Sequence, residues 1–239
     1  MVQTLRIKKK NVQMIAHRGL SGLERENTCA AFVAAGNRSY FGIETDIHKT
    51  RDGQFVVFHD DNTQRLTDLD WIVEEHTLAE LRVLGLRDLD GNIRGDLVMP
   101  TLQEYLRICK KYEKTAVLEL KNPFQKQDIE AVVEIIRQES WLENTVFISF
   151  DLENMIHLRN LLPVQPLQYL VKELTEETKD DLVKYELELD IKYTGISPAQ
   201  VDEIHRLGRK VNVWTVNDRE SAELLIQMGV DYITTNILE

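Results

Sequence analysis

The sequence predicts a (β/α)8 TIM barrel, an α/β fold in which parallel strands alternate with helices. Eight β-rich runs alternate with helix-like runs along the 239 residues, and short connections between them are typical of a parallel sheet covered by helices. Eight such units fit a barrel of about 250 residues. The rival is a doubly wound open sheet, which is disfavoured because no glycine-rich dinucleotide fingerprint follows the first strand.

The expected strands are rich in β-branched and apolar residues. They span residues 13–17, 43–48, 115–120, 145–149, 167–171, 191–196, 210–216 and 232–235. The expected helices lie near residues 28–35, 102–112, 128–138, 152–161, 176–185, 198–207 and 218–228. Thr101 and Glu104 form a capping-box pattern at one helix start, and Gly208 and Gly229 stand where two helices should end.

We expect a single domain over residues 1–239, with an insertion at approximately 60–100 that follows the second strand and its hairpin. This insertion is too long for an ordinary connection. It is expected at the barrel mouth, either as a cap or as a loop with a structural role only. No full helix follows the last strand, so the N-terminal segment or a partner chain, as in a homo-oligomer, is expected to cover that gap.

Composition excludes several classes of protein. Apolar residues make up 43% and charged residues 29% of the chain, which is ordinary for a globular protein. No apolar run approaches the ~20 residues of an integral membrane segment, and residues 1–10 do not resemble a signal peptide. The formal charge of −11 argues against binding nucleic acid. Cys29 and Cys109 lack metal or redox spacing and are expected to be buried thiols, in agreement with a cytoplasmic location.

A hairpin signal follows the start of the second strand. Residues 42–48 alternate apolar and polar side chains, which is the period of a strand. Glu44 and Asp46 therefore point to the same face. An Asp-Gly turn leads into a second β-rich run, which is expected to bring His59 back alongside Glu44.

Acidic side chains gather where strands of the barrel end. Active sites of such barrels lie at the C-terminal ends of the strands, where Glu44 and Asp46 are joined by Glu119 from the third strand. Burying three unpaired carboxylates is costly, and a divalent cation removes that cost. An all-oxygen set favours Mg²⁺, Ca²⁺ or Mn²⁺ over Zn²⁺. Each carboxylate taken alone could instead be a solvated or salt-bridged side chain.

Two histidines flank this acidic group. His17 ends the first strand, and together with His59 it could act as base and acid on opposite sides of a phosphorus centre. Arg18 and Lys121 suit phosphate oxygens, or else pair with the same carboxylates. Trp214 either stacks on a substrate or fills the barrel. The other histidines are expected to lie at the surface or on helices and to have no role in the site; they are His48, His76, His157 and His205.

A series of short motifs extends over nearly the whole chain. The motifs are His17-Arg18-Gly19, Glu26-Asn27-Thr28, Glu44-x-Asp46, Thr50-x-Asp52-Gly53, His59-Asp60, Pro100-Thr101-Leu102, Glu119-x-Lys121, Ser149-Phe150, Trp214-Thr215-Val216-Asn217 and Gly229-Val230-Asp231. One motif alone is a weak signal, but the full ordered series is specific. In this respect the chain resembles the glycerophosphodiester phosphodiesterase family.

The resemblance implies a metal-dependent phosphodiesterase on a (β/α)8 barrel with a small insertion after the second-strand hairpin. Such an enzyme hydrolyses glycerophosphodiesters to sn-glycerol 3-phosphate and an alcohol. It implies Mg²⁺ or Ca²⁺, with Mn²⁺ as an alternative, on Glu44, Asp46 and Glu119. It also implies that His17 and His59 form the acid–base pair.

The substrate-binding residues that the resemblance implies are Arg18 and Lys121 for the phosphate, with Phe150 and Trp214 beside the glycerol or alcohol. The chain departs from the family at Arg25, where proline is usual, which adds a cation near the mouth. It also departs at the end of the last strand, where an aspartate of the family is missing from Thr234-Thr235-Asn236-Ile237.

Two functions from other classes stay open at this point. The same scaffold could bind a phosphodiester without cleaving it, although a complete acid–base pair argues against that. A metal-dependent isomerase or aldolase acting on sugar phosphates could use Lys121 on a carbonyl, but the paired histidines would then lack a purpose.

Overall fold

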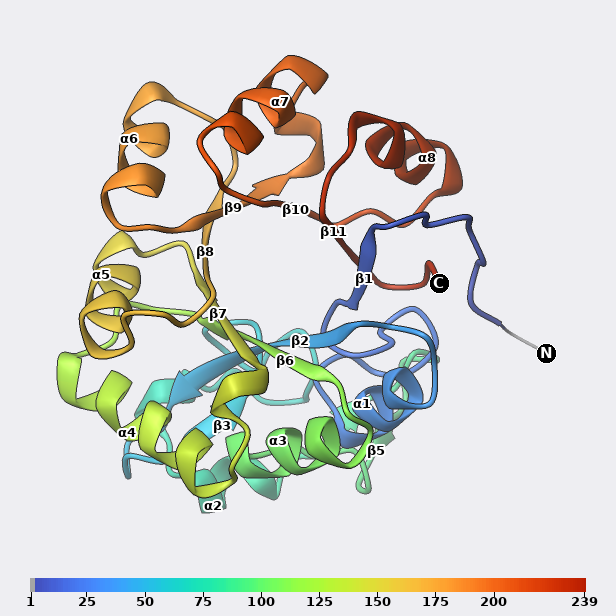
Figure 1. Cartoon of the computed structure of the whole chain (residues 1–239). Helices are drawn as coiled ribbons and strands as arrows, with labels where there is room; N and C mark the ends of the chain where they lie inside the picture. The colour runs from blue at the N-terminus through green and yellow to red at the C-terminus, as the bar shows by residue number, and fades with distance from the viewer. Residues whose placement is uncertain (1–2) are drawn as a thin grey trace.

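The parallel strands close into a ring surrounded by helices (Figure 1). The computed structural model describes residues 3–239. Its main sheet contains nine strands in the order β1-β11-β10-β9-β8-β7-β6-β2-β3, and β1 also pairs with β2. Because β3 (Phe55–Val57) is antiparallel to β2, it stands outside the ring, and the other eight strands are parallel. The β1–β2 pairing confirms the (β/α)8 barrel and excludes the open doubly wound sheet.

Each expected strand and helix is present. The ring consists of β1 (Gln13–Ala16), β2 (Gly42–Lys49), β6 (Thr115–Leu120), β7 (Thr145–Ser149), β8 (Leu167–Val171), β9 (Glu188–Lys192), β10 (Val211–Trp214) and β11 (Tyr232–Thr235). The helices around it are α1 (Cys29–Gly36), α3 (Leu102–Lys111), α4 (Lys126–Gln138), α5 (Leu152–Leu161), α6 (Glu176–Lys184), α7 (Pro198–Arg206) and α8 (Arg219–Met228). The capping box of Thr101 and Glu104 starts α3 as expected, and Gly229 ends α8 in the left-handed conformation.

The position predicted for β9 was wrong by three residues. This strand begins at Glu188, and residues 193–195 form a 3-10 turn. Leu189 and Ile191 are fully buried in the core outside the ring, so the alternate residues face the barrel interior. Two acidic residues in this alternation concealed the strand from a search for apolar β-rich runs.

The insertion is built around a hydrophobic cluster of its own. Within residues 60–100 lie a 3-10 turn, η1 (Val73–Glu75), the helix α2 (Leu78–Arg82) and a two-stranded sheet of β4 (Leu86–Arg87) and β5 (Ile93–Arg94). This cluster consists of Val56, Phe58, Leu66, Val73, Leu81, Leu84, Leu86, Leu97 and Met99. Because Val56 and Phe58 come from the hairpin, the cluster fastens the insertion to the barrel.

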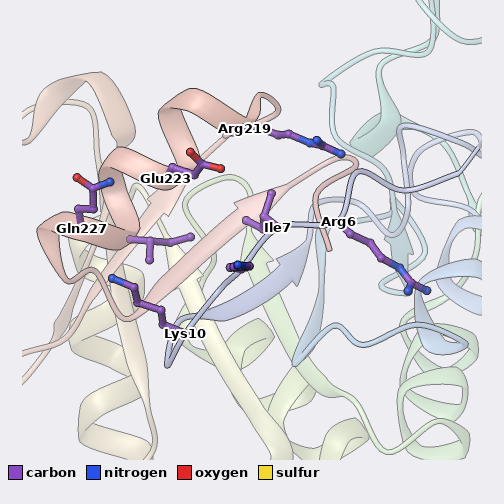
Figure 2. Close-up of a pocket in the computed structure, with 8 residues that line it drawn as sticks. Arg6, Ile7, Lys10, Arg219, Glu223 and Gln227 are labelled. Carbon is purple, nitrogen blue, oxygen red and sulfur yellow. The ribbon is translucent and has the colours of Figure 1, made fainter.

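The N-terminal segment packs beside the residues that follow β11, as one of the two expected arrangements had it. Backbone N–H groups of Leu5 and Ile7 donate to the carbonyls of Ile237 and Glu239 at 3.0 and 2.8 Å. Figure 2 shows the groove between this segment and α8, which is lined by Arg6, Ile7, Lys8, Lys10, Arg219, Glu223, Ile226 and Gln227. Among residues 3–239, no helix has the length and apolar character needed to cross a membrane.

The separate hydrophobic cluster of the insertion leads to a prediction about stability. Leu81 is fully buried in it, so Leu81→Ala should lower the free energy of unfolding by about 2–5 kcal/mol. Val83, which is 78% exposed and lies two residues further along the chain, provides a control, and Val83→Ala should cost less than ~0.5 kcal/mol. Urea denaturation measures both, and equal losses would contradict the packing described for the insertion.

Candidate active site

One cavity opens at the C-terminal ends of the barrel strands. It is lined by His17, Arg18, Glu44, His59, Glu119, Lys121, Ile148, Phe150, Leu170, Asp190, Trp214, Thr215 and Thr234. These include every candidate site residue from the sequence except Asp46, which lies directly behind the lining. The prediction that these side chains gather at one place in the barrel is therefore confirmed.

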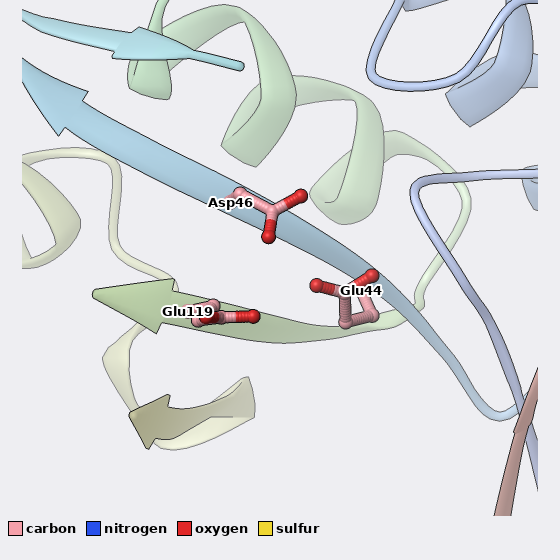
Figure 3. A group of neighbouring side chains, drawn as sticks. All are labelled: Glu44, Asp46 and Glu119. Carbon is pink, nitrogen blue, oxygen red and sulfur yellow. The ribbon is translucent and has the colours of Figure 1, made fainter. Parts of the chain in front are cut away.

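Three carboxylates meet on one wall of this cavity (Figure 3). Glu44 and Asp46 come from β2, and Glu119 comes from β6 directly beside Asp46 in the strand register. One oxygen from each side chain lies within 4.8 Å of the others, and all three residues are buried. Burial raises the pKa of Glu44, and the charges of Asp46 and Glu119 raise it further. Burial and Asp46 likewise raise the pKa of Glu119 to about 8.

Asp46 stays ionised at neutral pH because basic groups surround it. Burial opposes its charge, but Arg18 and Lys121 outweigh burial and lower the pKa of Asp46. The Arg18 Nε lies 3.6 Å and the Lys121 Nζ 3.4 Å from its carboxylate oxygens. The Asn27 side-chain amide also donates a hydrogen bond to Asp46 at 2.8 Å.

The carboxylate cluster fits a divalent cation by its chemistry. The two basic side chains offset the charge of Asp46, yet the raised pKa values of Glu44 and Glu119 show that further positive charge is needed before both ionise. A cation held by the three carboxylates can supply that charge.

His17 lies between the acidic wall and the end of β11. Its Nε2 is 3.9 Å from a Glu44 oxygen, and its Nδ1 is 2.7 Å from the Asn236 side-chain oxygen. Because the Asn236 oxygen can only accept a hydrogen bond, the proton of a neutral His17 is assigned to Nδ1. The unprotonated Nε2 then faces the cavity. Burial, followed by the Arg18 charge, lowers the pKa of His17 to about 4. Asn236 lies where the family usually has an aspartate. Its neutral amide therefore orients His17 without adding negative charge.

His59 is held by a chain of charged groups that begins in the insertion. Its Nδ1 is 2.7 Å from Asp60, whose other oxygen accepts from Arg65 at 2.6 Å. Arg65 also donates two hydrogen bonds to Glu26, which accepts from Arg18 at 2.8 Å. The insertion thereby contacts His59 through Asp60 and is linked to Arg18 through Glu26. Burial lowers the pKa of His59.

The hairpin register differs by one residue from the expectation. Ile47 pairs with Val57, and the Phe58 N–H donates to the Asp46 carbonyl. Extending this register places His59 opposite Thr45 rather than Glu44. His59 nevertheless reaches the shared cavity, because it follows the end of β3 and the chain turns there.

Two aromatic rings form the apolar side of the cavity. Phe150 and Trp214 pack edge to face with their centroids 5.5 Å apart. Arg25, the other departure from the family, donates to the Asp88 carbonyl at 2.8 Å, so its guanidinium fastens the insertion to the rim.

Sequence reasoning missed several residues around the site. Arg65 lies in the insertion and gave no signal. Asn236 was noted only as a departure from the family, although its position just after a barrel strand could have indicated its contact with the site. Asp190 was missed because β9 was placed too late. The expected surface position was wrong for His48, which is fully buried and lies 3.2 Å from Glu74.

Comparisons with known proteins agree with this fold and site. The glycerophosphoryl diester phosphodiesterase family model matches residues 17–239. YhdW of Bacillus subtilis (strain 168) is 33% identical over 230 residues, which cover 93% of each chain. A glycerophosphodiester phosphodiesterase of Caldanaerobacter subterraneus subsp. tengcongensis is 29% identical over 226 residues, again 93% of each chain. An Oleispira antarctica phosphodiesterase, solved with the product sn-glycerol-3-phosphate, matches with a TM-score of 0.87 at 31% identity, covering 94% of this chain and 92% of that chain.

The barrel, its mouth and these relatives define the class of protein as an enzyme that hydrolyses phosphoric diesters. Within that class, the chain belongs to the glycerophosphoryl diester phosphodiesterase family.

The crowded carboxylates make a pH-dependent prediction for the protein freed of divalent cations. The pKa of Glu119 rises from 4.5 to about 8 on folding, so its contribution to stability is present below pH 4.5 and is lost as the pH rises through 8. Because glutamine cannot ionise, Glu119→Gln should raise Tm relative to the wild type more at pH 8 than at pH 5.

Thermal denaturation of the two proteins across this pH range, after chelation, is the measurement. Glu220→Gln, at an exposed position on α8, serves as the control and should show no such trend. A constant difference between Glu119→Gln and the wild type would contradict the raised pKa.

Proposed function

We propose that the enzyme hydrolyses glycerophosphodiesters to sn-glycerol 3-phosphate and an alcohol, with His17 and His59 as the acid–base pair and a divalent cation on the three carboxylates. The observation that carries this proposal is the single cavity lined by both histidines and two of the three carboxylates, in a chain of this family. The paired histidines favour hydrolysis over a phosphodiester sensor or a carbonyl-activating lysine enzyme.

The positions of the side chains define what each would do. Arg18 and Lys121 border the acidic wall and donate to the nonbridging oxygens of the phosphate, which fixes the phosphorus beside both histidines. The neutral imidazole of one histidine takes the proton of the attacking hydroxyl, either the 2-hydroxyl of the substrate or water. The other histidine acts in its imidazolium form: it gives its proton to the departing alkoxide and is left neutral, while the first histidine is left protonated. Asn236 and Asp60 hold the two rings in orientation.

Glu44, Asp46 and Glu119 would hold the cation, for which their oxygens favour Mg²⁺ or Ca²⁺, with Mn²⁺ also suited. When bound, the cation would act as a Lewis acid that offsets the negative charge of the phosphate. Phe150 and Trp214 provide the surface for the carbon atoms of the substrate, and exclude water from that side.

Several expectations from the sequence stay predictions: that residues 1–239 form one domain, that the enzyme is cytoplasmic and that a homo-oligomer is one of the arrangements open to it. Residues 1–2 lie outside the described part of the chain.

The acid–base assignment predicts a large loss on removing either imidazole. His17→Ala and His59→Ala should each lower kcat on glycerophosphocholine by at least ~10²-fold, because proton transfer in the transition state is lost. Release of sn-glycerol 3-phosphate, measured with a coupled dehydrogenase, reports the rate. His157→Ala on α5 is the control and should keep wild-type turnover, and near wild-type kcat in either of the first two variants would refute the pair.

Metal removal tests the carboxylate cluster separately. Chelation should abolish turnover of glycerophosphocholine, and Mg²⁺ or Ca²⁺ should restore it, because phosphate binding beside three carboxylates needs their charge offset. Glu44→Gln should weaken the restoration, shown as a higher cation concentration for half-maximal rate. Full activity after exhaustive metal removal would rule out the cofactor.

A further inference from the structure

One buried carboxyl in the cavity has no part in the chemistry described above. Asp190 on β9 is 1% exposed and lines the cavity, and its Oδ1 has no hydrogen-bond partner among residues 3–239. Trp214 on the neighbouring strand β10 also lines the cavity, and its indole Nε1 is buried and likewise unpaired within that part of the chain. Buried polar atoms without partners are rare, and each calls for an explanation.

Other polar side chains at this level of the barrel satisfy one another. The Asn212 amide donates to Gln168 at 3.0 Å and accepts from the Thr234 hydroxyl at 3.2 Å. Gln168 in turn donates to Glu188 at 3.1 Å. These hydrogen bonds satisfy the polar side chains of the network within the packed barrel interior. They leave one oxygen of Asp190 without a partner among residues 3–239.

The unpaired groups lie across the barrel from the acidic wall. In the order of the ring, β9 is four strands from β2 in either direction, and β10 has the same relation to β6. Figure 1 shows these two pairs of strands on opposite sides of the ring. A substrate whose phosphate lies beside Glu44 and Glu119 would therefore direct its far end toward Asp190 and Trp214.

The chemistry of the two groups selects what the far end must be. The carbonyl oxygen of a carboxyl group accepts a hydrogen bond and an indole N–H donates one, so together they complement a hydroxyl group, which can do both. A choline quaternary ammonium has no N–H to donate and no lone pair to accept. An ethanolamine ammonium can donate to the carboxyl oxygen but cannot accept from the indole.

We propose that Asp190, assisted by the Trp214 N–H, binds the primary hydroxyl of the glycerol half of the substrate and so determines specificity for glycerol diesters. This inference rests on the proposed function. Burial raises the pKa of Asp190 well above its usual range, and the Asn212 side chain offsets part of that rise, so the group that meets the substrate hydroxyl is the neutral carboxyl. A hydroxyl bound here would give Asp190 Oδ1 and Trp214 Nε1 the hydrogen-bond partners that residues 3–239 do not supply.

The test compares two substrates that differ by one oxygen atom. They are glycerophosphocholine and the analogue in which hydrogen replaces the primary hydroxyl. The wild type should prefer glycerophosphocholine by about 10- to 100-fold in kcat/KM, because the analogue leaves a buried carboxyl oxygen without a hydrogen-bond partner. In Asp190→Ala, this preference should fall to about 3-fold or less, because glycerophosphocholine loses rate while the analogue does not.

Matched variants separate binding from packing. Asp190→Asn keeps an accepting oxygen and should recover part of the preference, whereas Asp190→Leu fills the volume without oxygen and should behave as alanine does. Glu188→Gln changes the carboxyl two residues earlier, which already has a partner, and should keep the full preference. Since the readout is a ratio between substrates, a general loss of stability cancels from it.

The outcomes distinguish this inference from the proposed function. Equal losses on both substrates in Asp190→Ala and Asp190→Leu would overturn the role of Asp190 while leaving the phosphodiesterase activity in place. Should the wild type cleave neither diester, the proposed function fails. In that case calorimetry compares the affinity for sn-glycerol 3-phosphate with the affinity for the same phosphate lacking the primary hydroxyl. Tighter binding of sn-glycerol 3-phosphate that depends on Asp190 supports the inference, and equal binding of the two refutes it.

Discussion

Mutual repulsion of three buried carboxylates is the constraint around which the mouth of this barrel is organised. Adjacent strands place their side-chain oxygens within 4.8 Å of one another, in surroundings where water cannot screen them. Two neighbouring cations, Arg18 and Lys121, hold Asp46 in its ionised form but leave the other two carboxyls with raised pKa values. A site with this imbalance is well suited to bind a divalent cation and a phosphate together.

The surrounding groups extend this balance of charge to the catalytic candidates. Arg65 joins Asp60 to Glu26, so that the orientation of His59 and that of Arg18 depend on the same guanidinium. The insertion thus acts on the site through ion pairs, and its own hydrophobic cluster keeps Arg65 in position. On the first strand, His17 depends instead on a neutral amide, Asn236, which orients the ring without charge.

Most of the fold and of the acidic wall could be predicted because both follow from local periodicity. Alternation in β2 put Glu44 and Asp46 on one face before any tertiary contact was known, and parallel strands bring Glu119 beside them. The same rule applied to β9 would have found Asp190, but acidic residues at the inward positions hid the strand. Inward-facing residues of a barrel need not be apolar where they line a site, and a search for apolar runs fails there.

Sequence alone determined the order of strands and helices, the candidate site residues and their place at strand ends, because these depend on spacing along one segment. Tertiary structure alone decided which partner each of those residues has: Asn236 for His17 across 219 positions, Arg65 for Glu26 across 39, and none for one oxygen of Asp190 among residues 3–239. Such pairings depend on ring closure and on how the insertion packs, and both are set by many distant contacts at once.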